Sequence, residues 1–136
     1  MKKVGVINQP IAAVISGLGH TDTIAIADAG LPIPATTQRI DLALTTGVPS
    51  FLETLRVVLS EMFVEKAIVA EEMKTVSPQM YAALTELLGN VPIEAIPHVE
   101  FKRETAVTKA IIRTGEFTPY ANVILVAGAW GFDLGD

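Results

Sequence analysis

Apolar positions along this chain follow two patterns, and each pattern predicts a different structural element. Short, mostly apolar runs bounded by glycine, proline or charged residues are typical of strands buried in a sheet. Runs of this kind recur at residues 23–27, 39–44, 66–70, 92–97, 110–113 and 123–127.

The segments between these runs carry apolar residues three and four positions apart, which predicts amphipathic helices. Proline or serine in the first turn and glycine after the last turn mark several of their ends. The expected helices cover residues 11–18, 51–62, 78–88 and 99–109. This alternation predicts an α/β fold: a single layered domain over residues 1–136, with a largely parallel sheet flanked by helices.

Half of the 136 residues are hydrophobic, 18% are charged, and the mean hydropathy is +0.45. Such an apolar excess predicts either a membrane segment or a subunit interface. The richest apolar run, residues 123–132, is much shorter than the ~20 residues that span a bilayer. Asn8, Gln9 and Pro10 interrupt the apolar residues 4–7 before these reach the length of a secretory signal. We therefore expect a cytoplasmic homo-oligomer with no membrane partner.

The residue types present exclude several classes of chemistry. The absence of cysteine excludes disulfides, thiolate catalysis and cysteine-ligated metals. The net charge of −5 argues against a nucleic-acid partner, which needs a basic surface. The spacing of Asp22 and His20 suits a shared metal ion, but two isolated histidines make a weak site, and we expect no metal. Small neutral ligands and protein partners remain.

Three titratable residues each follow a predicted strand: Asp28, Glu71 and His98. In α/β folds, ligands bind outside the carboxyl ends of the strands. This placement predicts a polar site at one edge of the sheet, although each residue also has a purely structural interpretation. Asp28 can satisfy nearby amides in the turn before Gly30. Glu71 and the adjacent Glu72 diverge in direction, so we expect one structural and one solvent-exposed carboxylate.

His20 lies between a helix stop and a strand start, where an imidazole can exchange protons near neutral pH. The alternatives are an exposed loop histidine or a cap on the preceding helix. Eight residues separate His20 from Asp28, and a straight strand would hold them about 20 Å or more apart. Either residues 20–22 fold back, or a site that uses both residues combines neighbouring subunits.

The loop at residues 118–122 adds a phenol and a carboxamide, from Tyr120 and Asn122. In an extended segment the two would lie on one side and could bind adjacent hydroxyls of a sugar. The alternative is a turn in which the tyrosine packs and the asparagine caps. Lys102 follows His98 by one helical turn, and it either faces the same site or is a solvated helix lysine.

Several longer motifs extend over nearly the whole chain. They lie at residues 18–23 (LGHTDT), 28–34 (DAGLPIP), 39–43 (RIDLA), 47–51 (GVPSF), 70–72 (AEE), 98–102 (HVEFK), 111–116 (IIRTGE) and 119–122 (PYAN). On these motifs the chain resembles the sugar mutarotase family, which includes ribose pyranases and fucose mutarotases. The run from Gly30 to Pro34 is similar to the ribose branch.

The resemblance implies an isomerase that interconverts β-D-ribopyranose and β-D-ribofuranose without metal or organic cofactor and feeds ribokinase. It also implies a cytoplasmic decamer of two pentameric rings. His20 matches the proton donor of the family. The substrate-binding positions are matched by Asp28, His98, Tyr120, Ala121 and Asn122, and a ligand-contacting lysine is matched by Lys102.

Two features depart from the family pattern. The usual His-Glu-Gln-Phe-Lys reads here His98-Val99-Glu100-Phe101-Lys102, which keeps the histidine and the lysine. The chain also continues past the usual end, from Ala129 to Asp136. Two alternatives are a mutarotase for another sugar such as fucose, and a ribose-binding accessory protein without catalytic activity.

Overall fold

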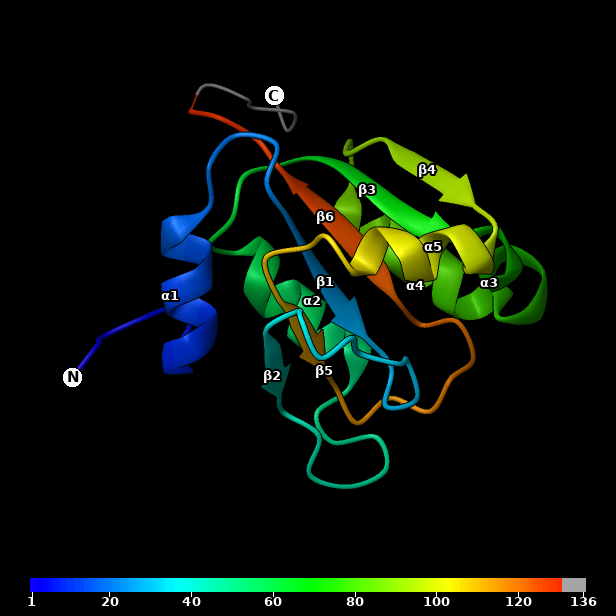
Figure 1. Cartoon of the computed structure of the whole chain (residues 1–136), viewed down its shortest axis with the longest axis horizontal. Coiled ribbons are helices and arrows are strands. Elements are labelled where there is room, and N and C mark those ends of the chain that lie inside the picture. The colour runs from blue at the N-terminus through cyan, green and yellow to red at the C-terminus, as the bar shows by residue number, and fades with distance from the viewer. Residues whose placement is uncertain (131–136) are drawn as a thin grey trace.

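The computed structural model describes residues 1–130 and forms a six-stranded sheet (Figure 1). Its strands are β1 (Thr23–Ala27), β2 (Arg39–Asp41), β3 (Val64–Ala70), β4 (Ile93–Ile96), β5 (Ile111–Arg113) and β6 (Val123–Ala127). Their order across the sheet is β2-β5-β1-β6-β3-β4. All strands except β6 run in one direction, and β6 is antiparallel to both of its neighbours, β1 and β3.

The α/β fold with a largely parallel sheet is therefore confirmed, with β6 as its one reversed strand. The reversal follows from the connection that precedes it. A parallel crossover needs a dozen or more residues and usually a helix. Residues 114–122 form a shorter loop without a helix, so the chain returns through the sheet in the opposite direction.

Helices cover both faces of the sheet. They are α1 (Gln9–Gly17), α2 (Phe51–Leu59), α3 (Glu71–Val76), α4 (Pro78–Leu88) and α5 (His98–Thr105). Figure 1 shows α5 in front of the sheet, with α2 and α4 behind it. Side chains that alternate along β1 divide between the two layers. Ile24 and Ile26 join the larger core cluster, and Ala25 and Ala27 face the smaller one with Phe101 of α5.

The strands at 23–27 and 123–127 and the helix at 78–88 are confirmed to the residue, whereas several other predicted ends are wrong. The first helix begins at Gln9 rather than residue 11, because Asn8 caps it by accepting from the Ile11 amide. The second helix ends at Leu59 instead of residue 62, and the predicted strand 39–44 ends at Asp41. The helix expected at 99–109 runs from His98 to Thr105. The short helix α3 was not predicted at all.

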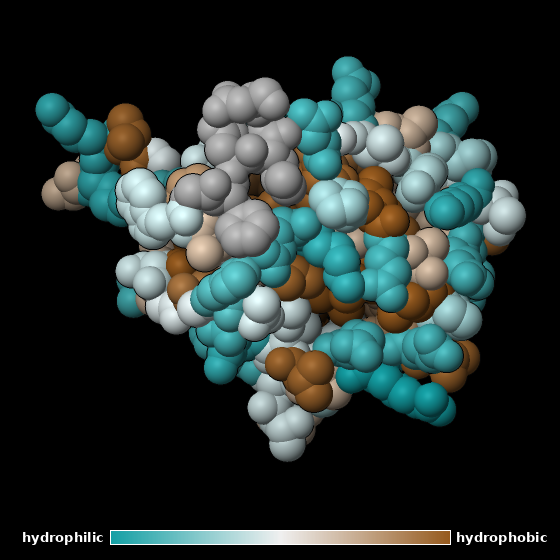
Figure 2. Space-filling model, turned by 90° about the horizontal axis from the view of Figure 1, so that it is seen from above, coloured by the Kyte–Doolittle hydropathy of each residue, from teal (hydrophilic) through white to brown (hydrophobic). Residues whose placement is uncertain are grey.

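Large hydrophobic side chains remain exposed outside these cores. On the face seen in Figure 2, hydrophobic side chains are visible between hydrophilic ones. Leu44, Phe117 and Trp130 are among the exposed examples. No helix among the described residues is long and apolar enough to span a bilayer. The part of the C-terminal extension at residues 131–136 lies outside the described residues.

Candidate functional site

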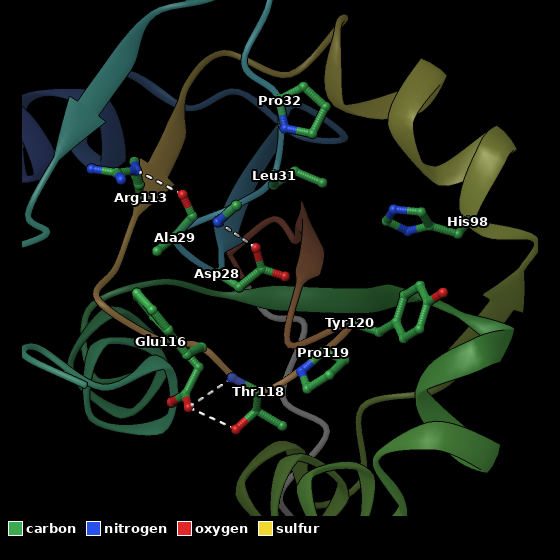
Figure 3. A pocket seen from close by; sticks show the side chains of 12 residues that line it. Asp28, Ala29, Leu31, Pro32, His98, Arg113, Glu116, Thr118, Pro119 and Tyr120 are labelled. Carbon is green, nitrogen blue, oxygen red and sulfur yellow. Dashed lines mark hydrogen bonds between the residues drawn. The ribbon is translucent and has the colours of Figure 1, made fainter. Parts of the chain in front are cut away.

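A pocket of about 500 Å³ lies at the carboxyl ends of the co-directed strands (Figure 3). Asp28 follows β1, His98 follows β4, and Tyr120 comes from the loop before β6. Figure 3 shows His98 and Tyr120 on one side of this pocket, Arg113 and Ala29 on the other, and Asp28 between them. The expected gathering of polar residues at this edge is thus confirmed for Asp28 and His98.

Asp28 is held in the pocket wall by hydrogen bonds to both carboxylate oxygens. The Gly30 amide donates to Oδ1 over 2.8 Å, and Asn122 Nδ2 donates to Oδ2 over 2.9 Å. The Asp28 amide in turn donates to Asn122 Oδ1 over 2.8 Å. Each carboxylate oxygen keeps a further lone pair that can accept from a ligand hydroxyl. Asp28 therefore makes the expected turn contact and also lines the pocket.

The extended geometry expected for Tyr120 and Asn122 is wrong. Tyr120 adopts a left-handed backbone with φ 62°, and the Asn122 amide donates back to the Tyr120 carbonyl over 2.8 Å. This turn sends the two side chains to different places. The phenol ring lines the pocket, whereas the Asn122 side chain is fully buried against Asp28. Ala121 between them is also fully buried.

His98 is the first residue of α5, and its ring packs between two aromatic rings. Phe101 lies nearly parallel at 6.1 Å, and Tyr120 meets it edge-on at 5.0 Å. The Glu72 carboxylate accepts from the His98 amide through both oxygens, at 3.0 and 3.2 Å. Glu71 is exposed, so the predicted pair of one structural and one solvent carboxylate is confirmed.

The two nitrogens of His98 differ in their surroundings. Nδ1 is buried and has no hydrogen-bond partner within the described part of the chain. A proton there would be buried without an acceptor, which is costly. The neutral ring therefore carries its proton on Nε2, where it can act as a hydrogen-bond donor.

Glu116 organises the loop that forms the floor of the pocket. Its carboxylate accepts from the Phe51 amide at the start of α2, over 3.1 Å, and from the Thr118 hydroxyl, over 2.8 Å. Burial alone would raise the pKa of Glu116. The hydrogen bonds from Phe51 and Thr118 outweigh that cost and lower the pKa below 4.5.

Arg113 braces the opposite wall. Its Nε donates to the Ala29 carbonyl over 3.0 Å, and a terminal nitrogen lies 3.1 Å from Asp41 Oδ1. Burial would raise the pKa of Asp41, but the Ala43 amide and then the guanidinium groups of Arg113 and Arg39 lower it below 3.8. The ion pair thereby fixes the turn that follows Asp28.

His20 lies at the other end of β1, in a second hollow of about 510 Å³ that Phe63 and Trp130 also line. Its side chain is half exposed, and Nε2 lies 3.0 Å from Glu65 Oε2. Residues 20–22 do not fold back toward Asp28, because the Thr21 amide donates to the Ala127 carbonyl at the end of β6. The chain thus separates His20 from the pocket that holds Asp28.

Lys102 is exposed on α5 and is not among the residues that line the Asp28 pocket. Asp22 accepts from the Gly19 amide, so its carboxylate closes the loop around His20. Across residues 1–130, no three His, Cys, Asp or Glu side chains gather as metal ligands would.

Sequence reasoning missed four residues that shape these sites: Glu65, Glu72 as a partner of His98, Arg113 and Glu116. Each acts through a partner that is distant in sequence, so local spacing carried no signal for its role. Only the motif at 111–116 offered an indirect signal in the sequence, because it places an arginine and a glutamate at the end of a predicted strand.

Comparisons with known proteins agree on one family. The profile described as "RbsD / FucU transport protein family" matches residues 1–130. The D-ribose pyranase of Coprothermobacter proteolyticus is 57% identical over 128 residues, which cover 94% of this chain and 98% of the relative. The D-ribose pyranase of Bacillus cytotoxicus is 55% identical with the same coverage.

Solved structures extend the comparison. Bacillus subtilis RbsD complexed with D-ribose matches with a TM-score of 0.92 at 50% identity, covering 95% of this chain and 98% of that one. The fucose mutarotase from Streptococcus pneumoniae, in complex with L-fucose, matches with a TM-score of 0.79 at 21% identity, covering 95% and 99%. The second match shows a shared fold alone.

Proposed function

Because the chain belongs to the RbsD / FucU transport protein family, we propose that it is a D-ribose pyranase, an isomerase that interconverts β-D-ribopyranose and β-D-ribofuranose. One observation of the site carries the proposal. Asp28, His98 and Tyr120 converge on one pocket, whose carboxylate, imidazole and phenol suit a small molecule rich in hydroxyl groups. The furanose product is the ring form that a ribokinase would use, in the cytoplasm.

The reaction needs only proton transfers and positioning. In ring opening, His20 gives a proton to the pyranose ring oxygen, the bond from that oxygen to C1 breaks, and the anomeric hydroxyl loses its proton to water. In closure, the 4-hydroxyl oxygen attacks the C1 aldehyde and gives its proton to His20. Water returns a proton to the C1 oxygen. Asp28, His98 and Tyr120 form the wall that orients the sugar. Ala121 and Asn122 are buried behind this wall and support it, and Lys102 lies one helical turn beyond His98.

We place the complete site between two copies of the chain. His20 and the Asp28 pocket lie at opposite ends of β1, about 20 Å or more apart at ~3.3 Å per residue. One pentose cannot reach both within one copy. Exposed Phe117 beside the first pocket and Trp130 beside the second supply apolar rims that a contact between copies would bury. An assembly of closed rings, such as two stacked pentamers, would repeat this contact between copies at every site.

The first test is ribose ring-form exchange, followed by saturation-transfer NMR with and without the protein. We expect the wild-type protein to accelerate exchange. His20→Ala is expected to lose the ~10²- to 10⁴-fold contribution of general acid–base catalysis while it still binds ribose. Wild-type exchange in that variant would refute the role of His20. Ribose binding without any acceleration by the wild-type protein would favour the accessory binding protein, and faster exchange of L-fucose would favour another sugar.

The second test asks which copy supplies which residue. His20→Ala and Asp28→Asn are each expected to be inactive as pure proteins. After the two are unfolded together and refolded as an equimolar mixture, about a quarter of the sites would combine an intact His20 with an intact Asp28 from its neighbour. Recovery of about a quarter of the activity supports a shared site. No recovery, in mixtures that sedimentation shows to be assembled, would place both residues in one copy.

A further inference from the structure

We propose that Glu65 is the residue that positions His20 for proton transfer, an inference that rests on the proposed role of His20. Glu65 Oε2 lies 3.0 Å from His20 Nε2, although 45 positions separate the two residues in sequence. The Glu65 side chain is only 20% exposed, compared with 49% for His20. The carboxylate is thus the more sheltered member of the pair, as suits a group that orients an exposed acid.

A bulge in the sheet aims Glu65 at His20. Val64 pairs with Ala127 and Lys66 pairs with Val126, so Glu65 has no counterpart of its own on β6. An extra residue of this kind bends the strand and redirects its side chain. The next residue, Lys66, binds Glu94 on β4 over 2.6 Å. Lys66, the neighbour of Glu65 on β3, therefore forms its ion pair with Glu94 and does not neutralise Glu65.

The loop that carries His20 is anchored to the same point of β6. The Thr21 amide donates to the Ala127 carbonyl over 2.9 Å, and the Ala127 amide donates to the Asp22 carbonyl over 2.8 Å. Thr21 adopts φ 73°, a left-handed conformation that strains a β-branched residue and persists only when its surroundings impose it. Because Ala127 also pairs with Val64, the sequence neighbours of His20 and of Glu65 are both fixed to the same residue of β6.

The chemistry of the pair assigns a role to each nitrogen of His20. A carboxylate can only accept, so Nε2 carries the proton of the neutral ring, and proton exchange with the sugar falls to Nδ1. In the imidazolium that precedes proton donation, Nε2 keeps its proton toward Glu65 and Nδ1 carries the proton that is transferred. The other acidic groups near this hollow have their own partners. Asp22 accepts from the Gly19 amide, and Glu61 accepts from the Val6 amide.

The test compares Glu65→Gln and Glu65→Asp with the control Glu86→Gln, which removes an exposed charge on α4. Glu65→Gln is expected to lower kcat about tenfold and to leave KM within about twofold, because its amide can present either a donor or an acceptor to His20. Glu65→Asp keeps the charge and is expected to recover part of kcat. Glu86→Gln is expected to keep both parameters.

A second readout does not depend on activity. Long-range ¹H–¹⁵N spectra report which nitrogen of a neutral imidazole is protonated, and the chain has only two histidines, so His20→Ala assigns the signals. We expect the wild-type His20 to be protonated on Nε2 and Glu65→Gln to show a mixture of the two forms. An unchanged His20 spectrum in Glu65→Gln would overturn the inference.

Two further outcomes separate this inference from the proposed function. If His20→Ala is inactive and Glu65→Gln keeps the wild-type kcat, the positioning role of Glu65 fails and the pyranase stands. If the wild-type protein does not accelerate ribose exchange, the proposed function fails, and the spectra still decide whether Glu65 sets the proton on His20. Loss of kcat together with loss of assembly in both Glu65 variants would make Glu65 structural and also overturn the inference.

Discussion

The buried Asn122 side chain offers a direct test of how the pocket is built. Asn122→Ala removes a fully buried carboxamide that joins the loop before β6 to the end of β1. Two hydrogen bonds are lost. Asn122 Oδ1 no longer accepts from the Asp28 amide, at 2.8 Å, and Nδ2 no longer donates to Asp28 Oδ2, at 2.9 Å. The Asp28 side chain then keeps only the bond from Gly30.

The size of the loss follows from these contacts. A buried amide left without an acceptor costs about 1–3 kcal/mol. The bond to the carboxylate is charge-assisted, but Asp28 is partly exposed, so solvent screening reduces its contribution to about 1 kcal/mol. We therefore expect the free energy of unfolding to fall by about 2–4 kcal/mol. The freed Asp28 carboxylate should also raise the KM for ribose.

Urea unfolding at fixed protein concentration measures the change, because assembly makes stability depend on concentration. A double-mutant cycle with Asp28→Ala isolates the side-chain pair, since the Asp28 amide remains in that variant. Asn122→Asp keeps the acceptor and sets two carboxylate oxygens face to face. Its loss should exceed that of Asn122→Ala, because two like charges in contact repel each other. A loss below about 0.5 kcal/mol in Asn122→Ala would refute the reasoning.

Two further predictions concern the loop after β5. Glu116→Gln should lower stability by about 1 kcal/mol at pH 7, and by less as the pH falls below 4.5. The lowered pKa of Glu116 makes its contribution present above the ordinary value of 4.5 and lost as the pH falls through the folded value; urea unfolding across this range checks it. Gly115→Ala should cost about 2–3 kcal/mol, because an added Cβ would lie 2.5 Å from the Thr45 and Val48 carbonyl oxygens. Thermal unfolding should show no such loss for the control Gly17→Ala, where nothing lies within 4 Å.

The strands and the larger helices could be predicted from local pattern. The run at 23–27 is apolar because β1 is buried on both faces, and burial of that kind leaves a continuous apolar signature. The ends of helices and strands were less predictable where a contact with a distant residue determines them. Helix α5 begins at His98 because Glu72 accepts from its amide, and no local residue caps it.

The candidate site divides in the same way. Residues at strand ends could be predicted, because the carboxyl ends of co-directed strands meet at one edge. The partners of those residues could not be predicted. Tyr120 adopts a left-handed backbone conformation. The Asn122 side chain is hydrogen-bonded to Asp28, which lies 94 positions earlier. The prediction that Tyr120 and Asn122 lie on one side assumed an extended segment, and that assumption includes neither the left-handed turn nor the contact with Asp28.

By itself, the sequence determined the alternation of strands and helices, the α/β class, and the presence of a strand between His20 and Asp28. These properties follow from short-range periodicity and from the length of an extended chain, which the order of residues carries directly. The tertiary structure alone decided the reversal of β6, the bulge that aims Glu65 at His20, and the burial of Asn122. These depend on which distant backbones become neighbours, and that is known only once the sheet has formed.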